Sequence, residues 1–563
     1  MTRARAHVVP ALVLALAVAG CAAIPVSGPV QEGDADVHEP DSVVVIAEGP
    51  EQDASPERIV DGFLLATVAG LSGRLDFEIA TAFLSPDAAA TWDPLGGVTI
   101  VSATKVERAA ATRVTVDAAV VGKVDADGRY AEASPDARET LTFDMVQDSR
   151  QQWRIATAPA GLILTARQFA DQYRAEQLYF LTPDATLLVP ETRFYPVANL
   201  PTSVVKGLLG GPSPWLRDAV RTEVPRGALL APAAVTVDDA GRAEVDLGPV
   251  GAVLTADRPL MLAQIEATLR QVPQVRSVVV RAGTGGTQLE GTAQLSAAAA
   301  AEVAAPEMIR VEPFRDVDQL ATLTDGRLTG VPEVGTLAGL DARAPARSED
   351  GTVRVMLAGP DTLVLAPSPD APAVPLYSGP ALVGPSVDRL GWAWTATGST
   401  LVAVGRSGTV VSMAPPWLVD RQVHALRVSR DGTRIAVVSA GADGVSVDVA
   451  GIARDEMGAP QQVSDPAVRV GASLTAADEV VWIDDTTVAV LGIVAGSASV
   501  RKVPVGAPSE PLPDVAGAVS IAGARADRSL LVATADGELL RYDGRTWAEV
   551  PRITGVRDPA YPG

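Results

Sequence analysis

The sequence predicts a multidomain protein, with N-terminal α+β domains followed by a C-terminal all-β propeller. Its 563 residues are enough for roughly three or four domains that each bury a core. Helical and strand patterns alternate up to about residue 310, whereas only short apolar strands occur after it. These later strands and their turns recur as a repeated unit, which is typical of propeller blades.

Residues 1–20 have the layout of a secretory signal peptide: a basic start, an apolar run and then small residues. Val18-Ala19-Gly20-Cys21 fits a lipobox, and Cys21 is the only cysteine of the chain. We therefore expect cleavage before Cys21 and its diacylation, because two lipid chains anchor a protein stably whereas one is marginal. A plain signal peptide and a transmembrane helix are the alternatives, and the short apolar run argues against the helix.

Residues 21–54 read as a lipidated, acidic tether rich in proline and glycine, which cannot bury a core. We expect the stretch 42–47 to be extended and to dock onto a neighbouring sheet. The predicted location is the extracytoplasmic face of the cell membrane, held by the lipid anchor. A net charge of −22 disfavours nucleic acid and anionic polymers as direct partners, although it also fits a merely soluble acidic surface.

Residues 55–170 are predicted to form a small α+β domain. Ser55-Pro56 and Ser85-Pro86 are helix-start signals, because serine caps a helix and proline suits its first position. Strand patterns follow over residues 98–106, 112–124, 139–146 and 152–157. Helices followed by an antiparallel meander often form a cone with a pocket.

Residues 175–290 alternate strands with two helices, expected over 200–209 and 259–271. Five motifs appear here in order: Tyr179-Phe180, Leu188-Val189-Pro190-Glu191-Thr192-Arg193, Gly207-Leu208-Leu209-Gly210-Gly211-Pro212, Val245-Asp246-Leu247 and Gln264-Ile265-Glu266-Ala267-Thr268-Leu269. This region resembles the GerMN domain of spore-germination proteins and envelope lipoproteins. The resemblance implies a binding module and supplies no catalytic residues.

Residues 291–310 are predicted to be a linker, and residues 311–563 a β-propeller-like domain. Its unit is strand, acidic-glycine turn, strand, turn, strand, and it returns roughly every 35 to 55 residues. Five blades can be counted in residues 353–542, and we expect a sixth to be closed by segment 311–332 pairing with the C-terminus. A β-sandwich is the alternative.

The sequence contains no phosphate-binding loop, CxxC, HExxH or GxSxG motif. His424 has no motif around it, so we expect no catalytic, cofactor-binding or metal-binding residues and a protein that is not an enzyme. Asp484-Asp485 and Asp125-Ala126-Asp127-Gly128 have oxygen ligands for calcium, but such turns usually cap their own backbone. The alternative is a wall-glycan-binding protein or glycan hydrolase that uses the propeller. The tryptophans that would stack on sugars, or fill blade cores, are Trp392, Trp394, Trp417, Trp482 and Trp547.

Lipobox, acidic tether, α+β domain, GerMN domain and propeller, taken together in this order, resemble the LpqB lipoproteins of actinobacteria over essentially the whole chain. The resemblance implies an association with the MtrA–MtrB two-component system. The expected partner is the extracytoplasmic part of the sensor histidine kinase MtrB, and the expected role is to modulate its signalling in cell-envelope homeostasis and cell division. No family binding residues carry over to numbered positions of this sequence.

Overall fold

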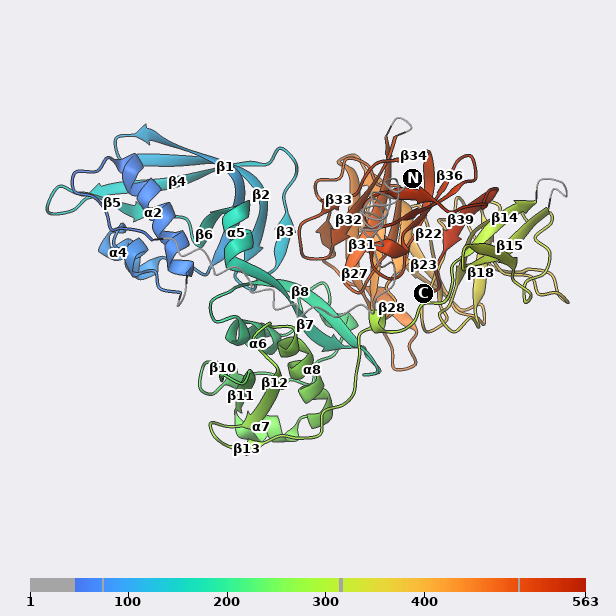
Figure 1. The fold of residues 1–563 in the computed structure, drawn as a ribbon, viewed down its shortest axis with the longest axis horizontal. Coiled ribbons are helices and arrows are strands. Elements are labelled where there is room, and N and C mark those ends of the chain that lie inside the picture. The colour runs from blue at the N-terminus through green and yellow to red at the C-terminus, as the bar shows by residue number, and fades with distance from the viewer. Residues whose placement is uncertain (1–45, 73–74, 313–316, 495–496) are drawn as a thin grey trace, which may run out of the picture. The chain divides into compact units, whose positions relative to one another are not determined.

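The computed structural model describes residues 46–72, 75–312, 317–494 and 497–563. The predicted signal peptide, Cys21 and most of the tether lie outside the described residues. Along the rest of the chain, an α+β domain is followed by a second domain built on a long hairpin, and then by a large all-β domain (Figure 1). The predicted fold class is confirmed in this order of domains.

The first domain begins with the helix that the sequence predicts. Helix α2 (Pro56–Leu71) has Ser55 as its N-cap, whose side chain accepts a hydrogen bond from the Arg58 backbone N–H. Helix α4 (Pro86–Thr91) repeats this arrangement with Ser85 as its cap, and the short α3 (Glu78–Thr81) lies between them. Ile59, Val60 and Phe63 point into the core from one face of α2, as their helical spacing predicts.

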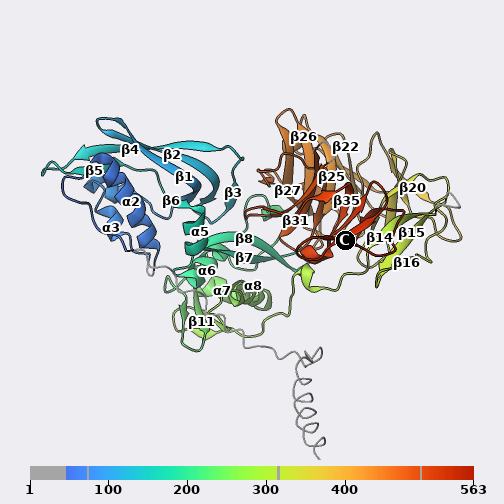
Figure 2. The same ribbon diagram turned by 45° about the horizontal axis from the view of Figure 1, so that its top comes forward.

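These helices cover a six-stranded sheet of order β5-β4-β2-β1-β6, with β3 added beside β2. Figure 2 shows α2 lying across one face of this sheet. The strands are β1 (Gly97–Ala110), β2 (Arg113–Asp125), β3 (Tyr130–Glu132), β4 (Arg138–Gln147), β5 (Trp153–Thr157) and β6 (Leu162–Thr165). All pairs are antiparallel except β1 with β6. The sequence did not predict β6 or the short helix α5 (Ala166–Gln172) after it.

The second domain is built on the hairpin of β7 (Tyr173–Leu181) and β8 (Leu188–Pro196). Its second sheet has the order β10-β11-β12-β13, with β9 also paired to β11. The parallel strands β11 and β12 are joined through two helices, α7 and α8. The remaining bounds are α6 (Leu200–Gly210), β9 (Leu229–Leu230), β10 (Thr236–Val237), β11 (Arg242–Gly248), α7 (Val250–Thr255), α8 (Arg258–Arg270), β12 (Ser277–Ala282) and β13 (Thr287–Gln288).

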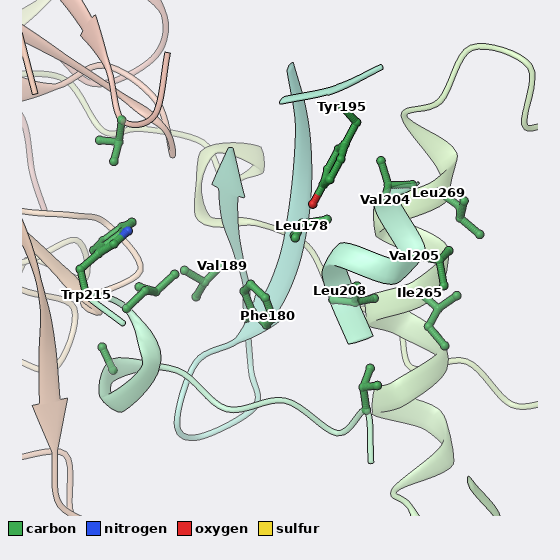
Figure 3. Packing of buried hydrophobic residues seen from close by; sticks show 14 of the residues in the cluster. Leu178, Phe180, Val189, Tyr195, Val204, Val205, Leu208, Trp215, Ile265 and Leu269 are labelled. Carbon is green, nitrogen blue, oxygen red and sulfur yellow. The ribbon is translucent and has the colours of Figure 1, made fainter. Parts of the chain in front are cut away.

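The core of this second domain lies between the hairpin and the two predicted helices. Leu178 and Phe180 point from β7 toward Val204 and Leu208 of α6, with Ile265 of α8 beyond them (Figure 3). All five side chains are fully buried. Apolar residues that alternate along β7 thus pack against apolar residues that recur every three or four positions along α6 and α8, and together they form one core.

Side chains of α8 satisfy the free edge of β7. The Gln264 side-chain amide donates to the Tyr179 carbonyl at 2.9 Å, and the Tyr179 N–H donates to the Thr268 hydroxyl at 3.2 Å. The Gln177 N–H donates to the Gln271 side-chain oxygen at 2.8 Å. Gln264 and Thr268 of α8 and its C-cap residue Gln271 follow helical spacing, so one face of this helix replaces a missing neighbouring strand.

The all-β domain consists, over described residues 307–560, of six four-stranded blades, two of which carry an extra short strand. In five blades the first strand in sequence lies at one edge, and these first strands contact one another in succession. In the sixth, β39 from the C-terminal end takes that position beside β14, which closes the propeller. The expected closure by the C-terminus is therefore confirmed, but the paired residues 307–310 precede the predicted segment 311–332 and lie in the predicted linker. A β-sandwich is ruled out.

The strands of the six blades are, from first edge to last, β39 (Val556–Ala560), β14 (Glu307–Glu312), β15 (Val317–Thr324) and β16 (Arg327–Gly330); β17 (Ala342–Arg347), β18 (Arg354–Ala358), β19 (Thr362–Leu365) and β20 (Val374–Ser378); β21 (Ser386–Val387), β22 (Ala393–Thr397), β23 (Thr400–Val404) and β24 (Val410–Met413); β25 (Gln422–Val428), β26 (Arg434–Gly441), β27 (Gly444–Arg454) and β28 (Pro460–Val463); β30 (Glu479–Trp482), β31 (Thr487–Val494), β32 (Ser497–Pro504) and β33 (Glu510–Pro511); and β35 (Ala518–Ala522), β36 (Leu531–Thr534), β37 (Leu539–Tyr542) and β38 (Trp547–Glu549). The extra strands β29 (Val468–Val470) and β34 (Val515–Ala516) pair with β27 and β32.

Arg434 joins the hairpin domain to the propeller. Its guanidinium forms a fully buried ion pair with Asp431 and lies 5.2 Å from the Trp482 ring centre. It also donates to the Pro190 carbonyl of β8 at 3.4 Å and to the Asp485 carbonyl at 2.6 Å. Burial alone would raise the pKa of Asp431, but the charge of Arg434 together with hydrogen bonds from Thr433 and Ser429 outweighs burial and lowers that pKa. The junction is therefore held by a charged group whose hydrogen bonds end on two domains.

A glycine allows the same two domains to approach closely. The Gly451 N–H donates to the Trp215 carbonyl at 3.0 Å. A Cβ at this position would lie 2.8 Å from both that carbonyl oxygen and the Ala219 Cβ. We predict that Gly451→Ala weakens the junction by about 1–3 kcal/mol, the usual penalty for overpacking. Thermal unfolding should begin at a lower temperature, and proteolysis of linker residues 291–306 should become faster. Gly210→Ala, where a Cβ meets nothing within 4 Å, is the matched control.

The buried carboxyl group of Glu176 in β7 should make the stability of the fold depend on pH. Burial raises the pKa of Glu176 to about 7, with Arg174 opposing the shift. The native state therefore keeps a proton that the unfolded chain releases from about pH 4.5 upward, so this group destabilises the fold as pH rises toward 7. Glu176→Gln should flatten the fall in melting temperature between about pH 4.5 and 7, whereas Glu290→Gln at an exposed site should not. An unchanged slope in Glu176→Gln would contradict this assignment.

Candidate interaction surface

The structure places four of the five singled-out tryptophans in roles that hold the propeller together. Trp394 is fully buried, and its indole N–H donates to Asp388 at 2.9 Å. The indole N–H groups of Trp417, Trp482 and Trp547 donate to backbone carbonyls of other strands or loops. Trp392 is half-buried and lines an open depression of about 550 Å³. Trp392, Trp417 and Trp547 are all half-buried, and of these Trp392 lines this depression.

The acidic turns cap their own backbone. Asp125 accepts hydrogen bonds from the Asp127 and Arg129 N–H groups at 3.0 and 2.8 Å, and Asp484 accepts one from Thr486 at 2.7 Å. Asp485 accepts from the Ala299 N–H of the linker, which contains a single 3-10 turn over residues 298–300. In the part of the chain that the structure describes, no group of three or more His, Cys, Asp or Glu side chains could hold a metal ion.

His424 is exposed on β25, at the β-bulge between Val423 and Ala425. Its imidazole takes part in no hydrogen bond or ion pair among the described contacts. A histidine on a solvated strand face, without a carboxylate to orient it, lacks the geometry of a general base.

The hairpin domain has an exposed apolar surface at the end where β9 meets α7. Leu229, Val250 and Leu254 are 68%, 44% and 48% exposed, and we call this trio the apolar tip. Leu229 pairs with Gly248 of β11, and because its neighbour Leu230 is buried, Leu229 faces the other way. Val250 and Leu254 lie one turn apart on α7, while Val253 between them points into the core. Because Leu229 pairs with Gly248, two residues before Val250, the exposed apolar side chains of the strand and the helix belong to neighbouring segments.

Small and basic residues surround the apolar tip. Exposed positions beside it on the chain are Pro232, Ala233, Ala234, Pro249 and Gly251. Arg226 and Arg258 are also exposed and precede β9 and begin α8, respectively. Neither arginine has a carboxylate within 4.0 Å among the described residues. Contiguous exposed apolar surface marks an interaction site, and arginine is enriched in such interfaces.

The sequence did not reveal the apolar tip. Helix α7 was not predicted, because its six residues are too few to show helical periodicity. The Gly248-Pro249 step at the end of β11 was the available signal, since proline near the start of a helix is favoured. None of the helices in the described part of the chain has the length and hydropathy required for a membrane span.

Comparison with known proteins covers almost the whole described chain. A family model described as the N-terminal domain of lipoprotein LpqB matches residues 49–170, and one described as sporulation and spore germination matches residues 177–287. A model described as the LpqB beta-propeller domain matches residues 318–562. The boundaries of these matches follow the three folded units of the structure.

Relatives named lipoprotein LpqB match over most of their length. The Streptomyces coelicolor protein is 28% identical over 617 residues, covering 98% of both chains. The Thermobifida fusca protein is 27% identical over 553 residues, covering 85% of this chain and 86% of the relative. The Mycolicibacterium smegmatis protein is 28% identical, covering 78% and 79%. With these relatives and the ordered match of all three domain models, the chain belongs to the LpqB lipoprotein family.

Proposed function

We propose that the protein is a lipid-anchored lipoprotein of the extracytoplasmic membrane face that binds and modulates a sensor kinase of the MtrB type. Its role would lie in cell-envelope homeostasis and cell division, and it would act by binding rather than by catalysis. The lipobox and the lipoprotein name of its relatives support the anchor. The apolar tip is the observation that carries the binding proposal, because it is an unpartnered apolar surface on a domain of a binding type.

The anchor limits where the partner can be. Between Cys21 and the first described residue, covalent geometry allows a reach of at most about 85 Å. The contact surface of a partner must therefore lie within this reach of the membrane plus the distance from residue 46 to the apolar tip. The extracytoplasmic part of a membrane sensor kinase meets this condition.

The chemistry of the apolar tip specifies the complementary surface. Burying Leu229, Val250 and Leu254 would supply the apolar centre of an interface, and Arg226 and Arg258 would lie at its rim. The Asp257 carboxylate beside Arg258 already accepts a hydrogen bond from the Leu260 N–H at the start of α8. We therefore expect an apolar patch bordered by carboxylates on the kinase. Rim charges act mainly on association rate, so the complex should form more slowly at high salt.

We predict that Leu254→Asp reduces recovery of the kinase from membranes by at least about tenfold, because a charge would be buried at the centre of the interface. The measurement is a quantitative pull-down with the full lipidated protein. Val419→Asp is the matched control, since Val419 is also an exposed branched apolar residue, 62% exposed, on the propeller. Equal kinase recovery with Leu254→Asp and wild type would rule out the apolar tip as the contact.

We predict that Cys21→Ala abolishes incorporation of a clickable fatty acid and releases the protein from the membrane fraction. The thiol of Cys21 is the acceptor of the first lipid group, and the chain has no second cysteine. Ser27→Ala, outside the lipobox, should label like wild type. Labelling that persists in Cys21→Ala would refute the anchor while leaving the kinase contact open to the pull-down test.

Wall-glycan binding is the second candidate, and one observation favours it. Trp392 lines the 550 Å³ depression together with Arg389, Arg406 and Asp350, a combination suited to stacking and hydrogen bonding with sugars. Incubation of the purified protein with peptidoglycan distinguishes glycan binding from glycan hydrolysis. Saturable binding lost in Trp392→Ala would support a lectin, and released muropeptides would overturn the non-catalytic proposal.

A further inference from the structure

A cavity of about 390 Å³ lies where the first domain meets the hairpin domain. The turn after β2, residues 125–129, forms one side of it, and β8 and α6 form the other. The two sides are fixed to each other, because the Phe194 N–H of β8 donates to the Gly128 carbonyl of this turn at 2.7 Å. The volume falls within the range of about 300–1,000 Å³ that is typical of small-molecule sites.

The cavity has an apolar side and a polar side. Leu75, Leu95 and Val98 of the first domain face the aromatic rings of Tyr173 and Phe194. Leu95 is 44% exposed, so part of this apolar wall is not covered by protein.

The polar side comes from α6. Ser203 and Lys206 lie about one turn apart on this helix and line the cavity, and the N-cap residue Asn199 lines it as well. Tyr195 adds a buried hydroxyl in the adjacent wall that has no hydrogen-bond partner among the described residues. Burial raises the pKa of Tyr195 to about 12, so this hydroxyl keeps its proton as a donor.

Gly207 sets the position of α6 against this wall. A Cβ there would lie 1.9 Å from the Tyr195 hydroxyl oxygen, so only glycine permits the observed approach. Figure 3 shows the Tyr195 hydroxyl directed toward α6 beside Leu178.

Lys206 is distinguished by its lack of a counter-charge. The other three lysines of the chain pair with carboxylates: Lys105 with Glu107 at 2.5 Å, Lys123 with Glu139 at 2.6 Å and Lys502 with Glu510 at 2.8 Å. Lys206 has no carboxylate within 4.0 Å among the described residues.

The two arginines around the cavity are already paired with carboxylates. Arg129 pairs with Asp125 and Asp127 at 3.3 and 2.7 Å. Arg193 pairs with Glu191 at 2.9 Å. Among the described residues, Lys206 is therefore the cation of the cavity lining that has no carboxylate within 4.0 Å.

We propose that this cavity binds a small amphipathic organic anion. Its anionic head would lie against Lys206 and Ser203, and its apolar body against Leu95, Tyr173 and Phe194. The site lies away from the apolar tip and does not depend on the kinase contact. Because both domains contribute walls, an occupied cavity also stabilises their junction.

The test uses three probes on the full chain: 4-phenylbutyrate, its uncharged amide and acetate. Isothermal titration should show saturable 1:1 binding of phenylbutyrate, binding of the amide weaker by about tenfold, and no binding of acetate, which lacks the apolar body. Bound phenylbutyrate should also raise the melting temperature. Absence of saturable phenylbutyrate binding at 10 mM, roughly the weakest affinity of such small ligands, would overturn the proposal.

Variants assign the binding to the cavity. Lys206→Met should bind phenylbutyrate and the amide equally, because it keeps the apolar stem and removes the charge. Lys105→Met is the matched control and should keep the wild-type preference for the acid. Ser203→Phe should block both probes, and its melting temperature without ligand shows whether it folds. The site would be refuted if Lys206→Met still bound phenylbutyrate more tightly than the amide. It would also be refuted if Lys105→Met lost this preference.

Discussion

Strand β8 is buried along nearly its whole length, and the buried backbone of this strand is the constraint on which the described structure depends. Buried N–H and C=O groups must find partners, since each one left unpaired costs stability. On β8 those partners come from three domains: β7 within its own hairpin, the Gly128 carbonyl of the first domain and Arg434 of the propeller. The hairpin thus acts as a common support.

The same constraint explains the helix beside the hairpin. β7 has a partner strand on one side only, and a bare strand edge inside a protein would leave polar groups unsatisfied. Gln264 and Thr268 of α8 and its C-cap residue Gln271 supply these hydrogen bonds from buried or partly buried side chains. A buried glutamine on an apolar helix face costs stability unless its amide group is hydrogen-bonded. The buried position of Gln264 therefore indicates that its role is to satisfy the edge of β7.

Charges follow a related logic. The chain carries a net charge of −22, yet several arginines are buried where the domains and blades meet, each paired with a carboxylate. Such pairs contribute little net stability but are expensive to break, so they fix the relative placement of the elements that share them. The exposed Arg226 and Arg258 and the cavity-lining Lys206 stand outside this pattern. Cations without protein partners are available to a partner protein or a ligand, and both proposals use them.

The sequence alone determined the features that depend on neighbours along the chain. Ser55-Pro56 marked the start of α2, the repeat of strand and acidic turn identified the propeller, and the lipobox at Cys21 remains a prediction because it lies outside the described residues. Only the tertiary structure decided which faces meet. Leu229 and Leu254 join one surface, and Leu95 and Lys206 join one cavity, although each pair is widely separated in sequence. Periodicity shows which face of an element is apolar, but what covers that face depends on contacts between distant segments.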